Sequence, residues 1–454
     1  MNNRLVGKRV TLYCSPMFDG QYRSITFVAA VLCVLAQAVR ADDQNTTLQA
    51  LEAAAIHVRM GQFEEALARL SEVEAAEPDN PWMHYYRACA QTGCGDFYDA
   101  LRSFDQAHAA LDTLGDDPEL RQLIRSDRAR ARRNVFNASL TMGLGYDTNV
   151  SFLGGGTSDL GAIAGLGNGV FDAAAQIDFA LIATREHTLA GGFRTLQTRN
   201  FEIEQFDLQA YGAYLRYSRR FDEHWEATLR YDYDVTLLNN ESFLSNHAIS
   251  TSLRYRWLLP GEMIVPDATQ IFYRLETRDF LFETDPDLDR DGLAHYVGVE
   301  QSFKVQPIAE FPWVWDVSTG YQYGSISTEG EEFDRKTHDF LVALDMPLVN
   351  PKSPDQFLIL PDRELRFRFD AHWQIADYRN KSSFDRRRNV RDDLITDYGF
   401  TLSQTLLDDP DDGRVVLRGL IRWTDAESNV VLSDRSSPFT YDKFVYGVQV
   451  EWSW

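Results

Sequence analysis

Three aspartates at alternate positions form the part of this sequence that most resembles a metal site. Asp287, Asp289 and Asp291 precede Gly292, and carboxylates with this spacing converge on one cation in the first half of a calcium loop. The twelfth position of such a loop supplies a bidentate glutamate, but here it is Gly298. We therefore favour an acidic external loop over a calcium site, and we expect no cofactor.

Nucleophilic catalysis would need a serine or cysteine beside a base, and the sequence contains no Gly-x-Ser-x-Gly motif. The nine histidines are scattered without catalytic spacing. The formal net charge of -23 argues against nucleic-acid binding, which requires a basic surface. We expect a protein that is not an enzyme and has no nucleic-acid partner.

A second set of candidates lies in the N-terminal half, where Trp82, Tyr85 and Cys89 follow one another at helical spacing. On a helical repeat these side chains would point into the concave face that receives a peptide or protein client. The same spacing also suits residues that pack against the neighbouring repeat. Both interpretations remain open at this point.

Arginines alternate with aromatic residues in the C-terminal two thirds of the chain, as in strands whose successive side chains face opposite sides. An arginine on the lipid face of a membrane strand costs about 2–4 kcal/mol near the midplane, so the arginines should face inward. They could line a pore, although we favour ion pairs with aspartates that stabilise the barrel wall. The inward candidates are Arg230, Arg254, Arg256, Arg366, Arg368, Arg418 and Arg422.

Inward-facing residues of this kind must be positioned by strands. The stretch from Asp442 to Trp454 is predicted to be one, because its apolar side chains recur at every second position up to the C-terminus. A soluble sandwich strand could have the same alternation. The density of aromatic residues favours the closing strand of an outer-membrane barrel. Its outward residues are Phe444, Tyr446, Val448, Val450, Trp452 and Trp454.

The same period of two extends from Phe136 to the end of the chain and predicts an antiparallel barrel of about fourteen strands in residues 135–454. Short connections alternate with long ones, which is typical of periplasmic turns and external loops. The short ones include 185–187 and 260–263, and the long ones include 147–169 and 282–291. The proline-rich segment 347–361 is an exception.

Residues 42–134 have a helical pattern that repeats at the tetratricopeptide period of 34 residues. Gly61 and Gly95 are placed to open the turn within each helix pair, and Pro78 ends the first repeat. The arginine-rich segment after Pro118 reads as one further helix. The predicted fold is therefore an α+β multidomain chain with helical repeats followed by a barrel.

Residues 1–41 resemble a secretory signal, with an apolar segment from Ile25 to Ala36 and small residues before Asp42. Met17 is an alternative start. Cleavage would leave Cys89 and Cys94 as the cysteines of the mature chain, with their pairing open. The segment predicts an outer-membrane protein whose helical domain lies in the periplasm.

A repeat domain fused to a barrel of this size resembles the surface lipoprotein assembly modifier family, called Slam. The segment Gly145-Tyr146-Asp147-Thr148-Asn149-Val150 is similar to one found in that family and in related repeat-barrel proteins. The resemblance covers 47–454 and implies that the repeats receive a lipoprotein and that the barrel helps to move it to the cell surface.

Two alternatives remain: an exopolysaccharide export porin, and a plain porin or anchoring barrel. For all three, we expect contact with outer-membrane lipid and with the barrel assembly machinery. A periplasmic lipoprotein or a polysaccharide is the expected client.

Overall fold

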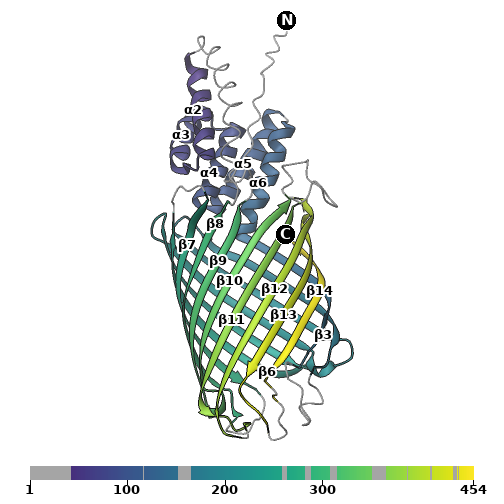
Figure 1. The fold of residues 1–454 in the computed structure, drawn as a ribbon. Helices are drawn as coiled ribbons and strands as arrows, with labels where there is room; N and C mark the ends of the chain where they lie inside the picture. The colour runs from purple at the N-terminus through teal and green to yellow at the C-terminus, as the bar shows by residue number, and fades with distance from the viewer. Residues whose placement is uncertain are drawn as a thin grey trace. The chain divides into compact units, whose positions relative to one another are not determined.

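The computed structural model describes residues 42–115, 117–151, 165–257, 263–281, 288–306, 314–349, 364–385, 387–409, 412–432, 437 and 439–454. The chain forms a helical unit that ends near Phe136 and a barrel unit that follows it (Figure 1). Among the described residues, the helices are too short or too polar to cross a membrane.

The helical unit consists of two helix pairs and a final helix. Gly61 and Gly95 occupy the turn within each pair with φ of 74° and 90°, a left-handed conformation that glycine adopts without a Cβ clash. Asn80 and Asp117 cap the helices that follow them, since each side chain accepts hydrogen bonds from two backbone N–H groups. The helices are α2 (Asp42–Arg59), α3 (Phe63–Ala76), α4 (Pro81–Cys94), α5 (Phe97–Leu114) and α6 (Pro118–Val135).

The core of this unit lies between the helix pairs, where Leu70, Met83 and Phe104 are fully buried. Ala54 and Ala88 are also fully buried, as expected for small residues at a close helix crossing. Cys89 and Cys94 both lie on α4 and are not joined by a disulfide.

The barrel consists of fourteen antiparallel strands in a closed order, as the alternation predicted. β14 pairs with β1, and the backbones of Ala138 and Trp454 exchange two hydrogen bonds of 3.0 Å. The strands are β1 (Phe136–Asp147), β2 (Asn168–Ala183), β3 (His187–Asn200), β4 (Leu208–Arg220), β5 (Trp225–Leu238), β6 (Glu241–Arg256), β7 (Ile264–Phe280), β8 (Gly292–Val305), β9 (Trp315–Thr328), β10 (Arg335–Val349), β11 (Leu365–Lys381), β12 (Val390–Asp409), β13 (Gly413–Ser428) and β14 (Tyr441–Ser453).

The two faces of the wall differ in polarity. On β14 the side chains from Phe444 to Trp452 at alternate positions are 42–54% exposed on the outside, whereas Lys443 and Glu451 belong to the inner face. An apolar outer face on a closed barrel is stable in a bilayer, because every strand edge is paired and lipid covers the apolar side chains. The protein is therefore an outer-membrane β-barrel with an N-terminal helical domain.

Two groups of aromatic side chains are prominent on the outer face. The first lies near the terminal rim, which is the end where β1 begins and β14 ends, and contains Trp225, Tyr255 and Trp257, whose neighbouring ring centroids are 4.8 Å apart. The second contains tyrosines near the middle of strands that lead to the opposite end, the distal rim. In this group a tyrosine hydroxyl lies 2.8 Å from a histidine of the next strand in three hairpins: Tyr231–His247, Tyr273–His295 and Tyr321–His338.

The predicted alternation of short and long connections is only partly right. At the distal rim, where long loops were expected, β5 and β6 are joined by the two residues Asn239 and Asn240. Their φ values of 51° and 64° are those of a tight hairpin turn, which asparagine tolerates better than most residues. Because β6 begins at Glu241, this hairpin extends well beyond the alternating run seen in the sequence. Most of segment 347–361 lies outside the described residues.

Candidate functional site: a polar pocket in the barrel lumen

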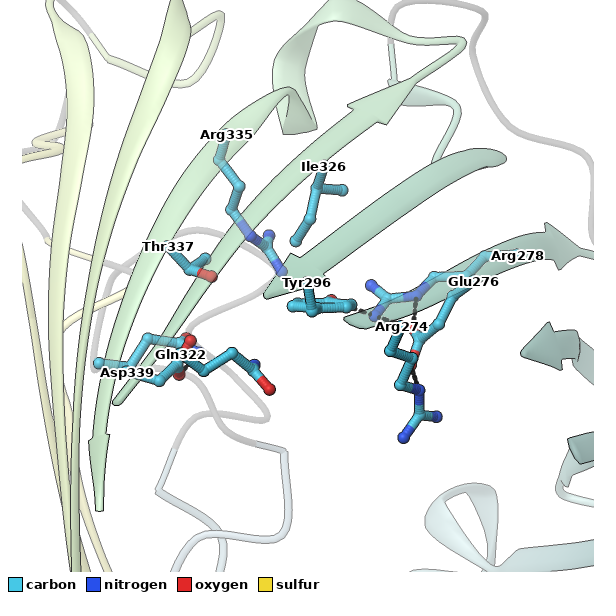
Figure 2. Close-up of a pocket in the computed structure, with 10 residues that line it drawn as sticks. Arg274, Glu276, Arg278, Tyr296, Gln322, Ile326, Arg335, Thr337 and Asp339 are labelled. Carbon is cyan, nitrogen blue, oxygen red and sulfur yellow. Dashed lines mark hydrogen bonds and ion pairs between the residues drawn. The ribbon is translucent and has the colours of Figure 1, made fainter. Parts of the chain in front are cut away.

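A pocket of about 300 Å³ lies on the inner face of the barrel wall, nearer the distal rim than the terminal rim (Figure 2). It spans five consecutive strands, β7 to β11, which bring together side chains separated by up to a hundred residues of sequence. The lining residues are Arg274, Glu276, Arg278, Tyr296, Gln322, Ile326, Arg335, Thr337, Asp339 and Gln374.

One side of the pocket is formed by Glu276 between two arginines of the same strand. Alternate residues of β7 face the lumen, so Arg274 Nε lies 2.7 Å from Glu276 Oε1 and Arg278 Nη2 lies 2.6 Å from Oε2. Arg278 also donates to the Tyr296 hydroxyl at 2.7 Å. Two guanidinium groups share one carboxylate, so this side keeps an excess positive charge.

The opposite side is formed by Asp339 and Thr337 on β10. Asp339 Oδ1 lies 3.0 Å from His372 Nε2 and accepts a hydrogen bond of 2.7 Å from Gln374. Asp339 Oδ2 and Thr337 Oγ1 are buried without a partner in hydrogen-bonding geometry. The two residues are 4% and 1% exposed, so neither oxygen has a protein partner of the kind that buried polar atoms normally have.

Arg335 lies at the end of the pocket nearest the distal rim. One Nη donates to the Tyr378 hydroxyl at 3.3 Å, and the guanidinium lies 5.6 Å from the centre of that ring. Its Nε is buried and unpaired, and no carboxylate among the described residues lies within 4 Å of it. Arg335 is therefore a half-buried cation whose closest partner is the Tyr378 side chain.

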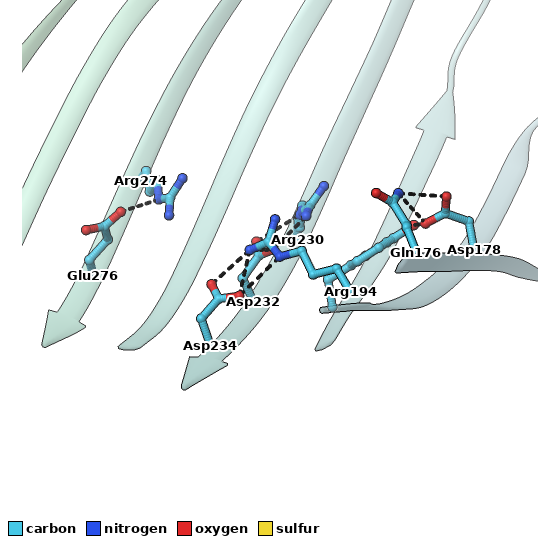
Figure 3. Close-up of polar contacts among 9 residues, drawn as sticks. Gln176, Asp178, Arg194, Arg230, Asp232, Asp234, Arg274 and Glu276 are labelled. Atoms are coloured by element: carbon cyan, nitrogen blue, oxygen red, sulfur yellow. Dashed lines mark hydrogen bonds and ion pairs between the residues drawn. The ribbon is translucent and has the colours of Figure 1, made fainter. Parts of the chain in front are cut away.

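The lumenal wall of β2 to β5 carries a second polar cluster (Figure 3). Asp178 accepts a hydrogen bond of 2.6 Å from the Tyr214 hydroxyl and others from Gln176. The Arg230 guanidinium lies 4.3 Å from the centre of the Tyr214 ring and 2.6 Å from Asp232. Each of these groups has a partner of opposite or complementary character.

The cluster continues across three strands because one of its positions is a glycine. Arg194 on β3 and Asp234 on β5 both pair with Gly212 on β4, and their side chains meet over it at 2.7 Å. A Cβ at Gly212 would lie 2.2 Å from Asp234 Oδ1 and 2.8 Å from Arg194 Nε. The missing side chain is what lets the ion pair form.

The seven predicted inward arginines each lie near a carboxylate on the lumenal side. The pairs therefore fit the interpretation favoured from the sequence, in which ion pairs stabilise the barrel wall. Their N–O distances are Arg230–Asp232 2.6 Å, Arg254–Asp267 3.8 Å, Arg256–Glu226 3.0 Å, Arg366–Asp345 2.7 Å, Arg368–Asp370 3.9 Å, Arg418–Glu451 2.7 Å and Arg422–Asp397 4.0 Å.

Two of the three calcium-loop candidates, Asp289 and Asp291, accept hydrogen bonds from backbone N–H groups. Asp289 accepts a hydrogen bond of 2.8 Å from the backbone of Asp291, and Asp291 accepts one of 2.5 Å from the backbone of Phe280. Each carboxylate thus stabilises the connection between β7 and β8. Asp287 lies outside the described residues, and Gly298 is within β8.

In the helical unit, Tyr85 is fully buried and its hydroxyl donates to Asp127 at 2.7 Å. Burial raises the pKa of the Asp127 carboxyl, opposed by the hydrogen bond from Tyr85 and by Arg130. Tyr85 therefore belongs to the core, and its placement in an open groove is corrected. Trp82 and Cys89 are partly buried and pack against the same core.

Sequence reasoning did not select the residues of the pocket. Arg274, Glu276 and Arg278 alternate in one predicted strand, which is the signal that would have placed them together on the inner face. Arg335 and Asp339 had no such signal, because their partners come from other strands.

In sequence, the chain matches no family model and no curated protein. Solved structures with a similar fold include a bacterial polysaccharide outer membrane secretin, with 10% identity over 71% of this chain and 99% of that one and a TM-score of 0.37. Omp33 of Acinetobacter baumannii has 9% identity over 70% and 98%, with a TM-score of 0.30. An anion-selective porin from Comamonas acidovorans has 8% identity over 70% and 99%, with a TM-score of 0.34. All three scores are below 0.5, and nothing about function follows from them.

Proposed function

We propose that this protein is a translocation or assembly protein of the outer membrane, in which the helical domain receives a client and the barrel helps to deliver it to the cell surface. The observation that carries the proposal is the polar inner wall. The side chains of Arg368 and Arg422 face the lumen and remain 58% and 56% exposed. A barrel of fourteen strands is wider than the eight-stranded barrels that side chains fill, so a hydrophilic client can be accommodated.

The resemblance to the Slam family supports a lipoprotein as this client. The helical unit precedes the barrel in the chain, and the proposed secretory segment would place it in the periplasm, where lipoproteins arrive. Trp82 is the aromatic candidate that retains exposed surface, while its rings also stack on Tyr86 at 5.7 Å. A partly exposed tryptophan is a common anchor in protein recognition.

We infer a transport role in preference to an enzymatic one because most charged groups of the described lumenal wall form structural ion pairs. Arg366, for example, lies within 3.7 Å of three carboxylates: Asp316, Asp345 and Glu364. Such groups stabilise the wall and present a hydrated surface to a passing client.

Export of a polysaccharide is a second candidate, and the pocket between β7 and β11 favours it. The pocket offers donors and acceptors side by side, as a hydroxyl-rich polymer requires. A lipoprotein client gives no particular reason for buried acceptors at Thr337 and Asp339.

The first prediction separates the two clients by surface display. Cells lacking the gene should lose protease-accessible lipoprotein from their surface, and a chain with Trp82→Ala should restore less display than the wild type. Tyr98→Ala is the matched control, because Tyr98 is an exposed aromatic residue of α5 outside the core cluster. Protease shaving of whole cells gives the measurement.

Heat-modifiable migration would show that each variant still forms a barrel. Normal display of every lipoprotein in the deletion strain, together with lost polysaccharide secretion, would replace the lipoprotein proposal with the second candidate. Normal display and normal secretion would contradict both.

A further inference from the structure

Three features of the lumenal pocket point to a bound ligand. It contains a half-buried arginine whose buried Nε has no partner and which pairs with no carboxylate, a buried carboxylate oxygen without a protein donor in hydrogen-bonding geometry, and space for a small molecule. We propose that the pocket binds one acidic sugar unit, a hexuronate, with its carboxylate on Arg335 and a hydroxyl group on Asp339.

The anionic part of the ligand is indicated by the arginines. The unpaired Nε of Arg335 belongs to a planar guanidinium, which matches a carboxylate with two parallel hydrogen bonds. Arg290, in the connection before β8, lies 4.3 Å from the centre of the Phe333 ring. Burial lowers the pKa of Arg290, and the charges of Arg335 and Arg391 lower it further. A carboxylate would relieve this repulsion.

The hydroxyl part is indicated by Asp339 and Thr337. Asp339 Oδ1 is already engaged with His372 and Gln374, whereas Oδ2 has no donor. A buried acceptor left unsatisfied is unfavourable, so a ligand hydroxyl that donates to it would be favoured. A simple anion such as phosphate would instead meet a carboxylate at this side of the pocket. The site therefore selects an acid that also carries hydroxyl groups.

Size and lining fit a sugar ring. The cavity of about 300 Å³ is at the lower end of the range of small-molecule pockets. Tyr296 and Ile326 supply apolar contact (Figure 2), while the amides of Gln322 and Gln374 can donate to and accept from neighbouring hydroxyls. The same ligand could reach the lumen as a free uronate or as one unit of a polymer.

The test uses the full-length protein purified in detergent and titrated calorimetrically with glucuronate, glucose and inorganic phosphate. Glucuronate should bind, and glucose and phosphate should bind at least about tenfold more weakly, since each satisfies only one half of the site. Arg335→Gln and Asp339→Asn should each weaken glucuronate binding by about tenfold or more. Arg368→Gln removes another lumenal arginine, outside the pocket, and should leave binding unchanged.

Arg335 also contacts Tyr378, so Asp339→Asn, which keeps the shape of the side chain, serves as the variant that preserves folding. Heat-modifiable migration would confirm the barrel in each case. Equal affinity for phosphate and glucuronate, or full binding by folded Asp339→Asn, would overturn the assignment. So would glucuronate binding weaker than about 1 mM, a free energy of about -4 kcal/mol.

Single-channel recordings in a planar bilayer distinguish the two sources of the ligand. Block of the current by oligoglucuronate at lower concentration than by the monomer would indicate a polymer, and equal block would indicate a free acid. Both results support the subsite, whereas current that neither compound affects would contradict a lumenal site. This inference concerns the barrel alone. Failure to bind glucuronate would contradict the subsite, whereas unchanged lipoprotein display in the deletion strain would contradict the proposed function.

Discussion

The lumenal walls of β2–β5 and β7–β11 both carry arginine, aspartate and tyrosine side chains, but these side chains are paired to different extents. On β2–β5, Arg230 and Asp232 form part of a cluster in which each charged group has a partner (Figure 3). On β7–β11, Arg335, Thr337 and Asp339 each retain an unpaired buried atom. Composition therefore does not decide whether a polar wall is structural or available to a ligand.

The difference arises from what lies between the charged residues. Gly212 on β4 leaves space for Arg194 and Asp234 to meet across it. At the corresponding place in the pocket, Gly324 on β9 lies between Tyr296 and Thr337, and a Cβ there would be 2.3 Å from Thr337 Oγ1. The Thr337 hydroxyl and the Tyr296 ring occupy this space, and they form no ion pair across the glycine. A glycine in the wall can thus admit an ion pair or two uncharged side chains.

The largest effect is expected from filling the space over Gly212. Gly212→Ala would force apart Arg194 and Asp234, because its Cβ would overlap the carboxylate. The free energy of unfolding should fall by about 2–3 kcal/mol, the upper part of the usual range for overpacking. Urea unfolding in lipid vesicles, followed by tryptophan fluorescence, gives the measurement.

Gly419→Ala is the matched control, since no atom lies within 4 Å of a Cβ placed there. If both variants unfolded at the same urea concentration, the ion pair across Gly212 would not be a stabilising part of the wall.

A smaller effect is expected from Asp232→Asn, which removes a buried carboxylate beside Arg230 and Arg194. Breaking such a pair leaves cations without their partner, and partial exposure of the arginines limits the loss to about 1–2 kcal/mol. The same unfolding experiment on Asp370→Asn should show almost no change, because its pair with Arg368 is long and exposed. Equal losses in the two variants would mean that burial does not distinguish these pairs.

The smallest change in stability is expected when a single hydroxyl group is removed. This change tests most directly whether polar groups are paired on β2–β5 and unpaired on β7–β11. Tyr214→Phe removes the donor to Asp178 and should lower the free energy of unfolding by about 1 kcal/mol. Thr337→Val removes a hydroxyl that has no partner, so stability should be unchanged or slightly higher. A clear loss of stability in Thr337→Val would show that this hydroxyl is already satisfied in the free protein, by water or by Asp339.

Much of the fold could be predicted from the sequence because both periods are strong local signals. Alternation from Phe136 to Trp454 predicted fourteen strands, and the 34-residue spacing of Gly61 and Gly95 predicted the turns of two helix pairs. Loop lengths were predicted less well, since apolar Leu237 and Leu238 are consecutive beside the tight turn at Asn239 and Asn240 and interrupt the alternation there.

The candidate site was predicted only in part. Alternation assigned the arginines to the inner face, because a charge on the lipid side is too unfavourable. It could not assign partners, since Arg335 and Glu276 lie on strands that are not neighbours and meet only through barrel closure and register. Nor could helical spacing separate core from groove at Tyr85, because its burial depends on Asp127 in another helix.

The sequence by itself determined the two structural units, the number of strands and the face on which each arginine lies, because these follow from the spacing of neighbouring residues. Only the tertiary structure decided which polar groups are satisfied. Gly212 lies under an ion pair and Gly324 under two uncharged side chains because of the residues that register places on either side of them, and register across a closed barrel is a property of all its strands together.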